Sequence, residues 1–361
     1  MILDIIILIA SLGFILLGAT FFTNGIEWLG KRLNLSEGAV GSILAAVGTA
    51  LPETLIPIIA ILFSTGAESH EVGIGAILGA PFMLSTLAFF IVGLSAVLFR
   101  RRRQVSPAAS ASPVRETESD SIGFIQAADK APALPYLSLD TSIMRRDLGF
   151  FLAVYTVALL TSLLPSGWIR PAIAVALVAA YLYYAAKTIK DGAEVGEHHL
   201  APLYFAKRAE NPALALILLQ VLLAIAGIAG AANLFVNALS SLSAAFGVPA
   251  LILSLFIAPV ATELPEKFNS VIWIREGKDT LALGNITGAM VFQSSMIPAL
   301  GIAFTPWALS PVAATSAVLA ILSAGMVYLA LRRTGRLRPV TLLLSGAFYV
   351  AFIFIATTGL V

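Results

Sequence analysis

Two copies of one short motif carry residue types that could bind a cation. Residues 49–53 read Thr-Ala-Leu-Pro-Glu and residues 262–266 read Thr-Glu-Leu-Pro-Glu, each inside a long apolar stretch. Proline removes a backbone donor and clashes with the carbonyl four residues earlier, so both helices are predicted to open there and to free carbonyl oxygens. These oxygens and the carboxylates of Glu53 and Glu266 would form the hard-oxygen site that Ca²⁺ prefers, with roughly six to eight ligands.

The composition places both motifs in a membrane. The chain has 361 residues, of which 59% are hydrophobic and 12% are charged, against about 25% charged in a typical soluble domain. A charged glutamate inside a membrane helix costs at least roughly 2.5 kcal/mol and usually marks a transport pathway. The net charge of +2 gives no basic patch for nucleic acid. The absence of cysteine excludes disulfides and thiolate metal sites.

Ten apolar stretches are predicted to cross the membrane as helices. They cover residues 2–30, 36–64, 72–98, 148–164, 168–188, 212–243, 248–274, 280–304, 309–331 and 340–360. Threading these spans alternately puts every Lys and Arg except Arg170 and Lys267 on one side, which the positive-inside rule identifies as the cytoplasm. Both termini are therefore expected outside, in the inner (plasma) membrane of a bacterium or archaeon.

The two halves of the chain resemble each other. The offset that aligns residues 49–53 with 262–266 also aligns Asn24 with Asn237. Because each half has five spans and the second half begins on the opposite side, the halves are inverted repeats, and such repeats indicate a secondary transporter with its site at their interface. The predicted fold is an all-α polytopic membrane protein with ten transmembrane helices in two inverted five-helix repeats, in which helices 2 and 7 are broken.

The duplicated motif and the Gly-rich helices that follow it resemble the α-repeats of the sodium/calcium exchangers, in the calcium/cation antiporter superfamily; the chain would be a divergent member. The resemblance covers nearly the whole chain apart from residues 99–147. It implies one ion site at mid-membrane and alternating access, in which the first and sixth helices slide against a core bundle. It also implies that Glu53 and Glu266 are the central cation-binding glutamates, and that Thr49 and Thr262 donate carbonyl or hydroxyl oxygen.

With this resemblance the chain divides into six segments. They are the first α-repeat with helices 1–3 (1–98), a flexible cytoplasmic linker (99–147), helices 4–5 (148–190), a cytoplasmic loop (191–211), the second α-repeat with helices 6–8 (212–304), and helices 9–10 (305–361).

Several positions depart from the family pattern. The serine that usually follows each threonine is Ala50 in one repeat and Glu263 in the other. The pattern Gly-Ser-Asn-x-x-Asn/Asp becomes Gly-Ala-Pro-Phe-Met-Leu at 79–84 and Gly-Ala-Met-Val-Phe-Gln at 288–293. The remaining candidates are the cation ligands Gln293 and Glu263 and the pathway positions Ala50, Asn285 and Ser85. Since sodium-coordinating side chains are replaced, divalent binding is better supported than coupling to Na⁺.

Lys267 follows Glu266 inside a predicted span and lies four residues after Glu263, a spacing that lets the two side chains pair on one helix face. One interpretation is an intramembrane pair that only stabilises the helix. In the other, the ammonium occupies the space of a cotransported cation or titrates in proton coupling. Either form of the second interpretation favours H⁺ or uncoupled exchange.

The sequence therefore predicts a secondary transporter and not an enzyme. It would exchange Ca²⁺ or another divalent cation for Na⁺ or H⁺. No cofactor is expected; the predicted partners are these ions and membrane lipid, with no nucleic acid and no obligate protein partner. Two alternatives stay open: a non-transporting binding or structural protein on a degenerate exchanger scaffold, and an intramembrane hydrolase that uses the two carboxylates as a dyad.

Overall fold

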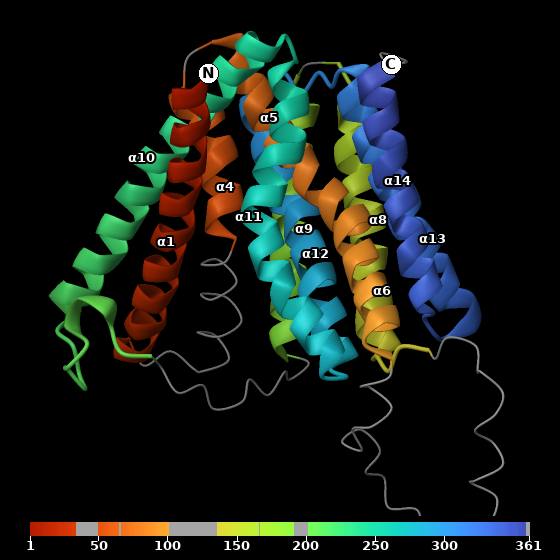
Figure 1. Cartoon of the computed structure of the whole chain (residues 1–361), viewed down its shortest axis with the longest axis horizontal. Helices are drawn as coiled ribbons and strands as arrows, with labels where there is room; N and C mark the ends of the chain where they lie inside the picture. Colours follow the sequence, from red (N-terminus) through yellow and green to blue (C-terminus); the bar gives the residue numbers. More distant parts are fainter. Residues whose placement is uncertain (34–49, 65, 101–135, 166, 191–200, 359–361) are drawn as a thin grey trace, which may run out of the picture.

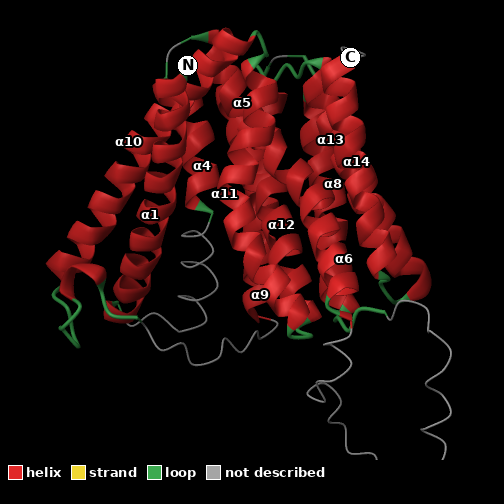
Figure 2. Ribbon diagram, viewed as in Figure 1, coloured by secondary structure: helices red, strands yellow, loops and turns green. Residues whose placement is uncertain are grey.

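The computed structural model describes residues 1–33, 50–64, 66–100, 136–165, 167–190 and 201–358. Within these ranges every regular element is helical (Figure 2). The α-helices are α1 (Ile2–Arg32), α4 (Leu51–Ile58), α5 (Ala67–Met83), α6 (Phe89–Leu98), α8 (Thr141–Thr161), α9 (Ile169–Lys190), α10 (Leu214–Phe246), α11 (Ala250–Arg275), α12 (Asp279–Phe304), α13 (Pro311–Thr334) and α14 (Pro339–Thr358). Two π-helical segments, η2 (Ile59–Phe63) and η3 (Leu84–Ala88), extend α4 and join α5 to α6.

Helical structure lies in each of the ten stretches that the sequence marks as spans. Seven of the described helices are long and apolar enough to cross a membrane, counting Glu68–Leu98 as one, and Pro52–Phe63 and Ala250–Glu263 are shorter apolar helices. The all-helical membrane architecture is confirmed, and the count of ten spans stays a prediction. Residues 34–49, most of the linker and residues 191–200 of the second loop lie outside the described residues.

The predicted break in helix 7 is wrong for the backbone, because α11 continues as one helix through Pro265. A proline withdraws a single N–H donor, and a membrane helix tolerates that loss where neighbours or side chains compensate. In the first repeat, α4 begins at Leu51 with Pro52 in its first turn, where no intrahelical donor is needed. The stretch before it lies outside the described residues.

The linker boundary also differs from the sequence prediction. Helix α8 begins at Thr141 instead of near 148, and Asp140 caps it by accepting a hydrogen bond from the Ser142 N–H at 2.8 Å. An N-cap aspartate satisfies one of the first free N–H groups of a helix. The last residues assigned to the linker therefore belong to the bundle.

The helices form two groups that meet along α4 and α11 (Figure 1). Helices α1 and α10 pack along each other at one side of the bundle. An ideal Cβ on Gly18 would lie 2.5 Å from Ile228 Cγ1, and one on Gly25 would lie 2.7 Å from Val221 Cγ2. Small residues at such contacts let membrane helices approach closely.

The other group is built around α5 and α12. Helix α5 packs against α11, and an ideal Cβ on Gly75 or Gly79 would come within 2.5 or 2.4 Å of the carbonyl oxygens of Leu251 and Leu255. Helix α12 packs against α8 and α9, while α6 packs against α14. These contacts hold the middle of α11 and α12 inside the bundle.

Candidate functional site

Glu53 is a buried carboxylate in the first turn of α4, with 9% of its surface exposed. Helix α4 contacts α5, α10 and α11, and Figure 1 shows it beginning in the interior of the bundle. The N-terminal turn of a helix favours negative charge because its free N–H groups point toward that end. The structure thus holds an acidic side chain inside the protein, away from lipid.

A second polar cluster, composed of Glu263, Lys267 and Gln293, lies at mid-length of α11 and α12. Glu263 and Lys267 are 1% and 2% exposed, and the Lys267 Nζ lies 3.2 Å from the Glu263 Oε2. The Gln293 Nε2 donates a hydrogen bond of 3.1 Å to the other carboxylate oxygen, Oε1. The predicted pairing of Glu263 with Lys267 is confirmed. Removing two charges from water costs several kcal/mol per ion, so their mutual neutralisation makes this burial tolerable.

Thr262 precedes this cluster on α11 and is buried, and its hydroxyl donates to the Ala258 carbonyl at 3.0 Å. Glu266 lies in the same helix, one turn after Thr262, and its side chain is outside what the structure describes. Thr49 is also outside the described residues, while Ala50 is buried at the N-cap of α4. The threonine and glutamate positions of the second motif therefore share the middle of α11.

Two of the three predicted pathway residues, Ser85 and Asn285, are engaged elsewhere. The Ser85 hydroxyl donates within its own helix, 2.8 Å from the Pro81 carbonyl oxygen, and Ser85 is fully buried. The Asn285 amide lies 3.4 Å from the Ser270 hydroxyl and is half-buried. Neither residue has a described hydrogen bond to the Glu263 cluster: the Ser85 bond lies within one helix, and the Asn285 contact joins α12 to α11.

Sequence reasoning missed a further buried acid, Asp147. Asp147, only 2% exposed, accepts hydrogen bonds from the Tyr184 hydroxyl at 2.6 Å and from the Thr287 hydroxyl at 2.8 Å, and it pairs with Arg146 at 3.2 Å. One carboxylate thereby joins α8, α9 and α12. The N-cap signal at Asp140 could have placed Asp147 within a helix, but its partners are distant in sequence.

A third polar network ties α1 to α10 through the connection that precedes α10. The Asn24 side-chain oxygen, Oδ1, accepts from the Gln220 side-chain amide at 3.0 Å and from the Tyr204 backbone N–H at 3.2 Å. The Trp28 indole donates to the Ala201 carbonyl at 2.9 Å. Gln220 is fully buried and also donates to the Phe21 carbonyl at 2.8 Å. Residues 201–206 are therefore fastened to both helices.

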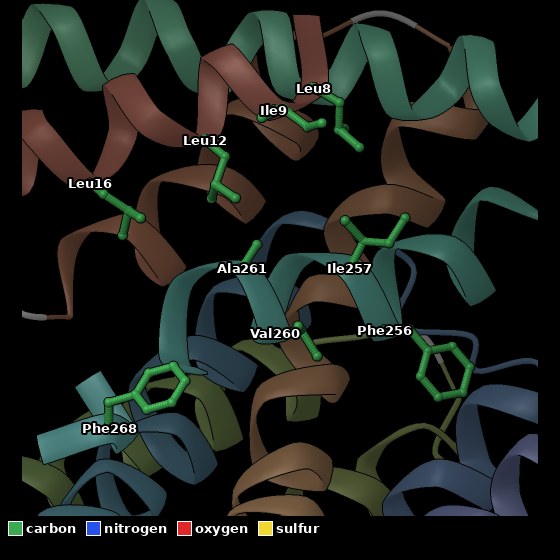
Figure 3. A pocket seen from close by; sticks show the side chains of 9 residues that line it. All are labelled: Leu8, Ile9, Leu12, Leu16, Phe256, Ile257, Val260, Ala261 and Phe268. Atoms are coloured by element: carbon green, nitrogen blue, oxygen red, sulfur yellow. The ribbon is translucent and has the colours of Figure 1, made fainter. Parts of the chain in front are cut away.

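An apolar groove of about 690 Å³ separates α1 from α11 (Figure 3). It is lined from α1 by Leu8, Ile9, Leu12 and Leu16, and from α11 by Phe256, Ile257, Val260, Ala261 and Phe268. A lining without carboxylates or amides offers no ligand for an ion, so the groove is not the cation site. It marks where the two helix groups are loosely packed.

Comparisons with known proteins show the family of the chain. The sodium/calcium exchanger protein family model matches residues 3–190 and 216–358. The putative antiporter CaxA of Alkalimonas amylolytica is 24% identical over 355 residues, covering 96% of each chain, and the inner membrane protein YrbG of Escherichia coli (strain K12) is 23% identical over 317 residues, covering 86% of this chain and 84% of the relative.

Solved structures share the fold. The H⁺/Ca²⁺ exchanger CAX superposes with a TM-score of 0.69 at 16% identity, over 98% of this chain and 81% of that one. The sodium-calcium exchanger NCX_Mj superposes with a TM-score of 0.52 at 19% identity, over 98% of both chains. The family match extends over almost all of the described helices and includes both copies of the motif. The chain therefore belongs to the sodium/calcium exchanger family.

Proposed function

We propose that this protein is a secondary active antiporter that exchanges Ca²⁺, or another divalent cation, for Na⁺ or H⁺. Glu53 and Glu266 would be the shared ligands, with oxygens of Thr49 and Thr262 completing the site. The observation that carries the proposal is the buried carboxylate of Glu53 on α4, a helix that packs against α11. The names of the relatives support the same class, since one is called a putative antiporter and one solved neighbour an H⁺/Ca²⁺ exchanger.

The helix contacts support the proposed inverted repeats. In that scheme helix 3, which is α5 with α6, corresponds to helix 8, which is α12. Helices 4 and 5, which are α8 and α9, correspond to helices 9 and 10, which are α13 and α14. Helix α12 packs against α8 and α9, and the α5 to α6 unit packs reciprocally against α13 and α14. Exchanging the halves therefore exchanges one set of contacts for the other, which is the behaviour expected of a pseudo-twofold axis.

Alternating access would follow from movement of α1 and α10 past the rest of the bundle. These two helices pack closely on each other, whereas an apolar groove lies between α1 and α11. A cation bound at the acidic site would change the relative energies of the outward and inward forms only through differential contacts with each. Competition of two kinds of cation for the same carboxylates would then produce exchange.

The test is ⁴⁵Ca²⁺ uptake into proteoliposomes under an imposed Na⁺ or pH gradient. Uptake driven by one gradient, lost in Glu53→Gln and in Glu266→Gln, would support the site and identify the coupling ion. Glu71→Gln is the matched control, because Glu71 is an exposed carboxylate on α5. Retained uptake in Glu53→Gln would contradict the assignment.

A non-transporting protein on an exchanger scaffold is the second candidate. It is favoured by the ion pair between Lys267 and Glu263, because that pair neutralises one buried carboxylate of α11 that could otherwise bind a cation. Folded wild-type protein that binds Ca²⁺ but carries none under either gradient would support this candidate. Membership in the sodium/calcium exchanger family does not support the hydrolase alternative.

A further inference from the structure

The Glu263 cluster has the composition of a cation site that already contains a positive charge. Both oxygens of the Glu263 carboxylate are engaged, one by the Lys267 ammonium at 3.2 Å and one by the Gln293 amide at 3.1 Å. All three side chains are at most 2% exposed. The Gln293 Oε1 is buried and accepts no hydrogen bond from a described residue.

The ligands in this cluster are those that a free metal cation would take. Carboxylate and amide carbonyl oxygens suit hard cations, and lysine supplies a compact point charge on a flexible stem. Lys267 emerges from the same helix as Glu263, one turn later, so its ammonium reaches the carboxylate without help from another element. The positive charge beside the acid is therefore supplied by the same helix that carries the acid.

We infer that the Lys267 ammonium is a tethered cation, which fills a position beside Glu263 and Gln293 that a free monovalent cation would otherwise occupy. This inference rests on the proposed function. Its consequence is that the protein exchanges divalent cations without a monovalent ion bound at this position. It assigns Lys267 as a specificity-determining residue. The other reading of the pair, a purely structural contact within α11, makes a different prediction.

The two readings separate when only the ammonium is removed. Lys267→Met leaves the Glu263 carboxylate buried without that positive charge, together with the free Gln293 oxygen. If the ammonium stands in for an ion, Na⁺ or K⁺ will bind there and stabilise the variant, because a ligand that binds only the folded state raises its stability with concentration. If the pair is only structural, Lys267→Met loses stability, and no alkali ion restores that stability more than another.

The experiment is thermal unfolding of the purified full-length protein in Na⁺, K⁺, Li⁺ or choline at constant ionic strength. We expect the Lys267→Met midpoint to rise saturably with one alkali ion relative to choline. This rise should exceed any rise in wild type or in the charge-neutral double variant, Glu263→Gln with Lys267→Met, both of which keep Glu53 and Glu266. Lys278→Met is the matched control, since it breaks an exposed ion pair with Glu276 of 2.8 Å and should respond to the four salts as wild type does.

Transport gives a second readout. In Lys267→Met, Ca²⁺ uptake should come to depend on the alkali ion that stabilises the variant, by a factor of at least about five, the lower end of typical coupling between two bound ligands. A Lys267→Met midpoint that responds to the four salts as wild type does would overturn the inference, and so would a variant that fails to fold in every salt, because a free ion ought to restore the missing charge.

Failure of the proposed function is separately visible. If wild-type protein carries no Ca²⁺, the antiporter proposal fails, yet the alkali-ion stabilisation of Lys267→Met can still be observed. If wild type carries Ca²⁺ and the variant ignores alkali ions, only the tethered-cation inference fails.

Discussion

Gly79 is the position where a single methyl group should disturb the candidate site without touching its ligands. Helix α5 crosses α11 at this glycine, and an ideal Cβ would lie 2.4 Å from the Leu255 carbonyl oxygen and 2.6 Å from Pro259 Cγ. The obstructing oxygen is backbone and cannot rotate away. Leu255 lies two turns before Glu263 on the same helix, so a displacement of α11 is transmitted to the buried acid.

The magnitude follows from two opposing effects. Relieving the contact requires α5 and α11 to separate by about 1 Å, and overpacking of this kind typically costs about 1–3 kcal/mol. Replacing glycine with alanine in a helix returns up to about 1 kcal/mol. Because the obstructing oxygen is backbone, the overpacking cost should lie in the upper part of its range, and we expect Gly79→Ala to lower the free energy of unfolding by about 1–2 kcal/mol. If about 1.4 kcal/mol of strain is present only in the Ca²⁺-bound arrangement, the apparent affinity falls about tenfold.

The assay is denaturant unfolding in detergent together with Ca²⁺ titration of the same preparations. Gly13→Ala is the control, because Gly13 is exposed on α1 and no described atom lies within 4 Å of its ideal Cβ. That variant should be as stable as wild type or slightly more stable, with unchanged affinity. If Gly79→Ala has the same stability and the same Ca²⁺ affinity as wild type, the close contact between α5 and α11 is refuted.

Two further predictions concern buried and capping acids. Asp147→Asn removes the charged acceptor for Tyr184 and Thr287 and should cost about 2–4 kcal/mol of unfolding free energy in detergent; an unchanged midpoint would contradict it. Hydrogen bonds from Ser142 hold the pKa of Asp140 below its usual range, so its stabilisation is present above about pH 4 and is lost as the pH falls through the lowered pKa. Asp140→Ala should therefore cost about 0.5–2 kcal/mol at neutral pH, with a difference from wild type that narrows as the pH falls through the lowered pKa. Asp140→Asn, which caps without titrating, should keep its stability across that range, and a loss in Asp140→Ala that persists in acid would contradict the capping role.

The sequence allowed the membrane class, the helix positions and one pair of site residues to be predicted. The pairing of Glu263 with Lys267 was predictable because residues four apart share a helix face, and that geometry is local. The predicted break in α11 was wrong because losing one donor at Pro265 does not require a helix to open when its neighbours support it.

The Asp147 network could not be predicted from local pattern. In sequence, Asp147 follows two arginines next to a polar linker and reads as solvated. Its burial depends on Tyr184 and Thr287, which tertiary packing brings from α9 and α12. Whether a charge at a helix end is solvated or buried depends on which helices pack beside it, and no local spacing encodes that.

The bonds that fasten residues 201–206 to α1 and α10 limit how this protein can move. The buried amides of Asn24 and Gln220 bond to each other and to the same short connection, and sliding one helix along the other would leave them unsatisfied in a dry interior. Under the proposed function, the helix pair and its connection would translate as one piece, so access to the two sides of the membrane would be governed by a single mechanical degree of freedom. A cross-link between α1 and α10 would leave that motion intact, whereas one between α1 and α11 would arrest it.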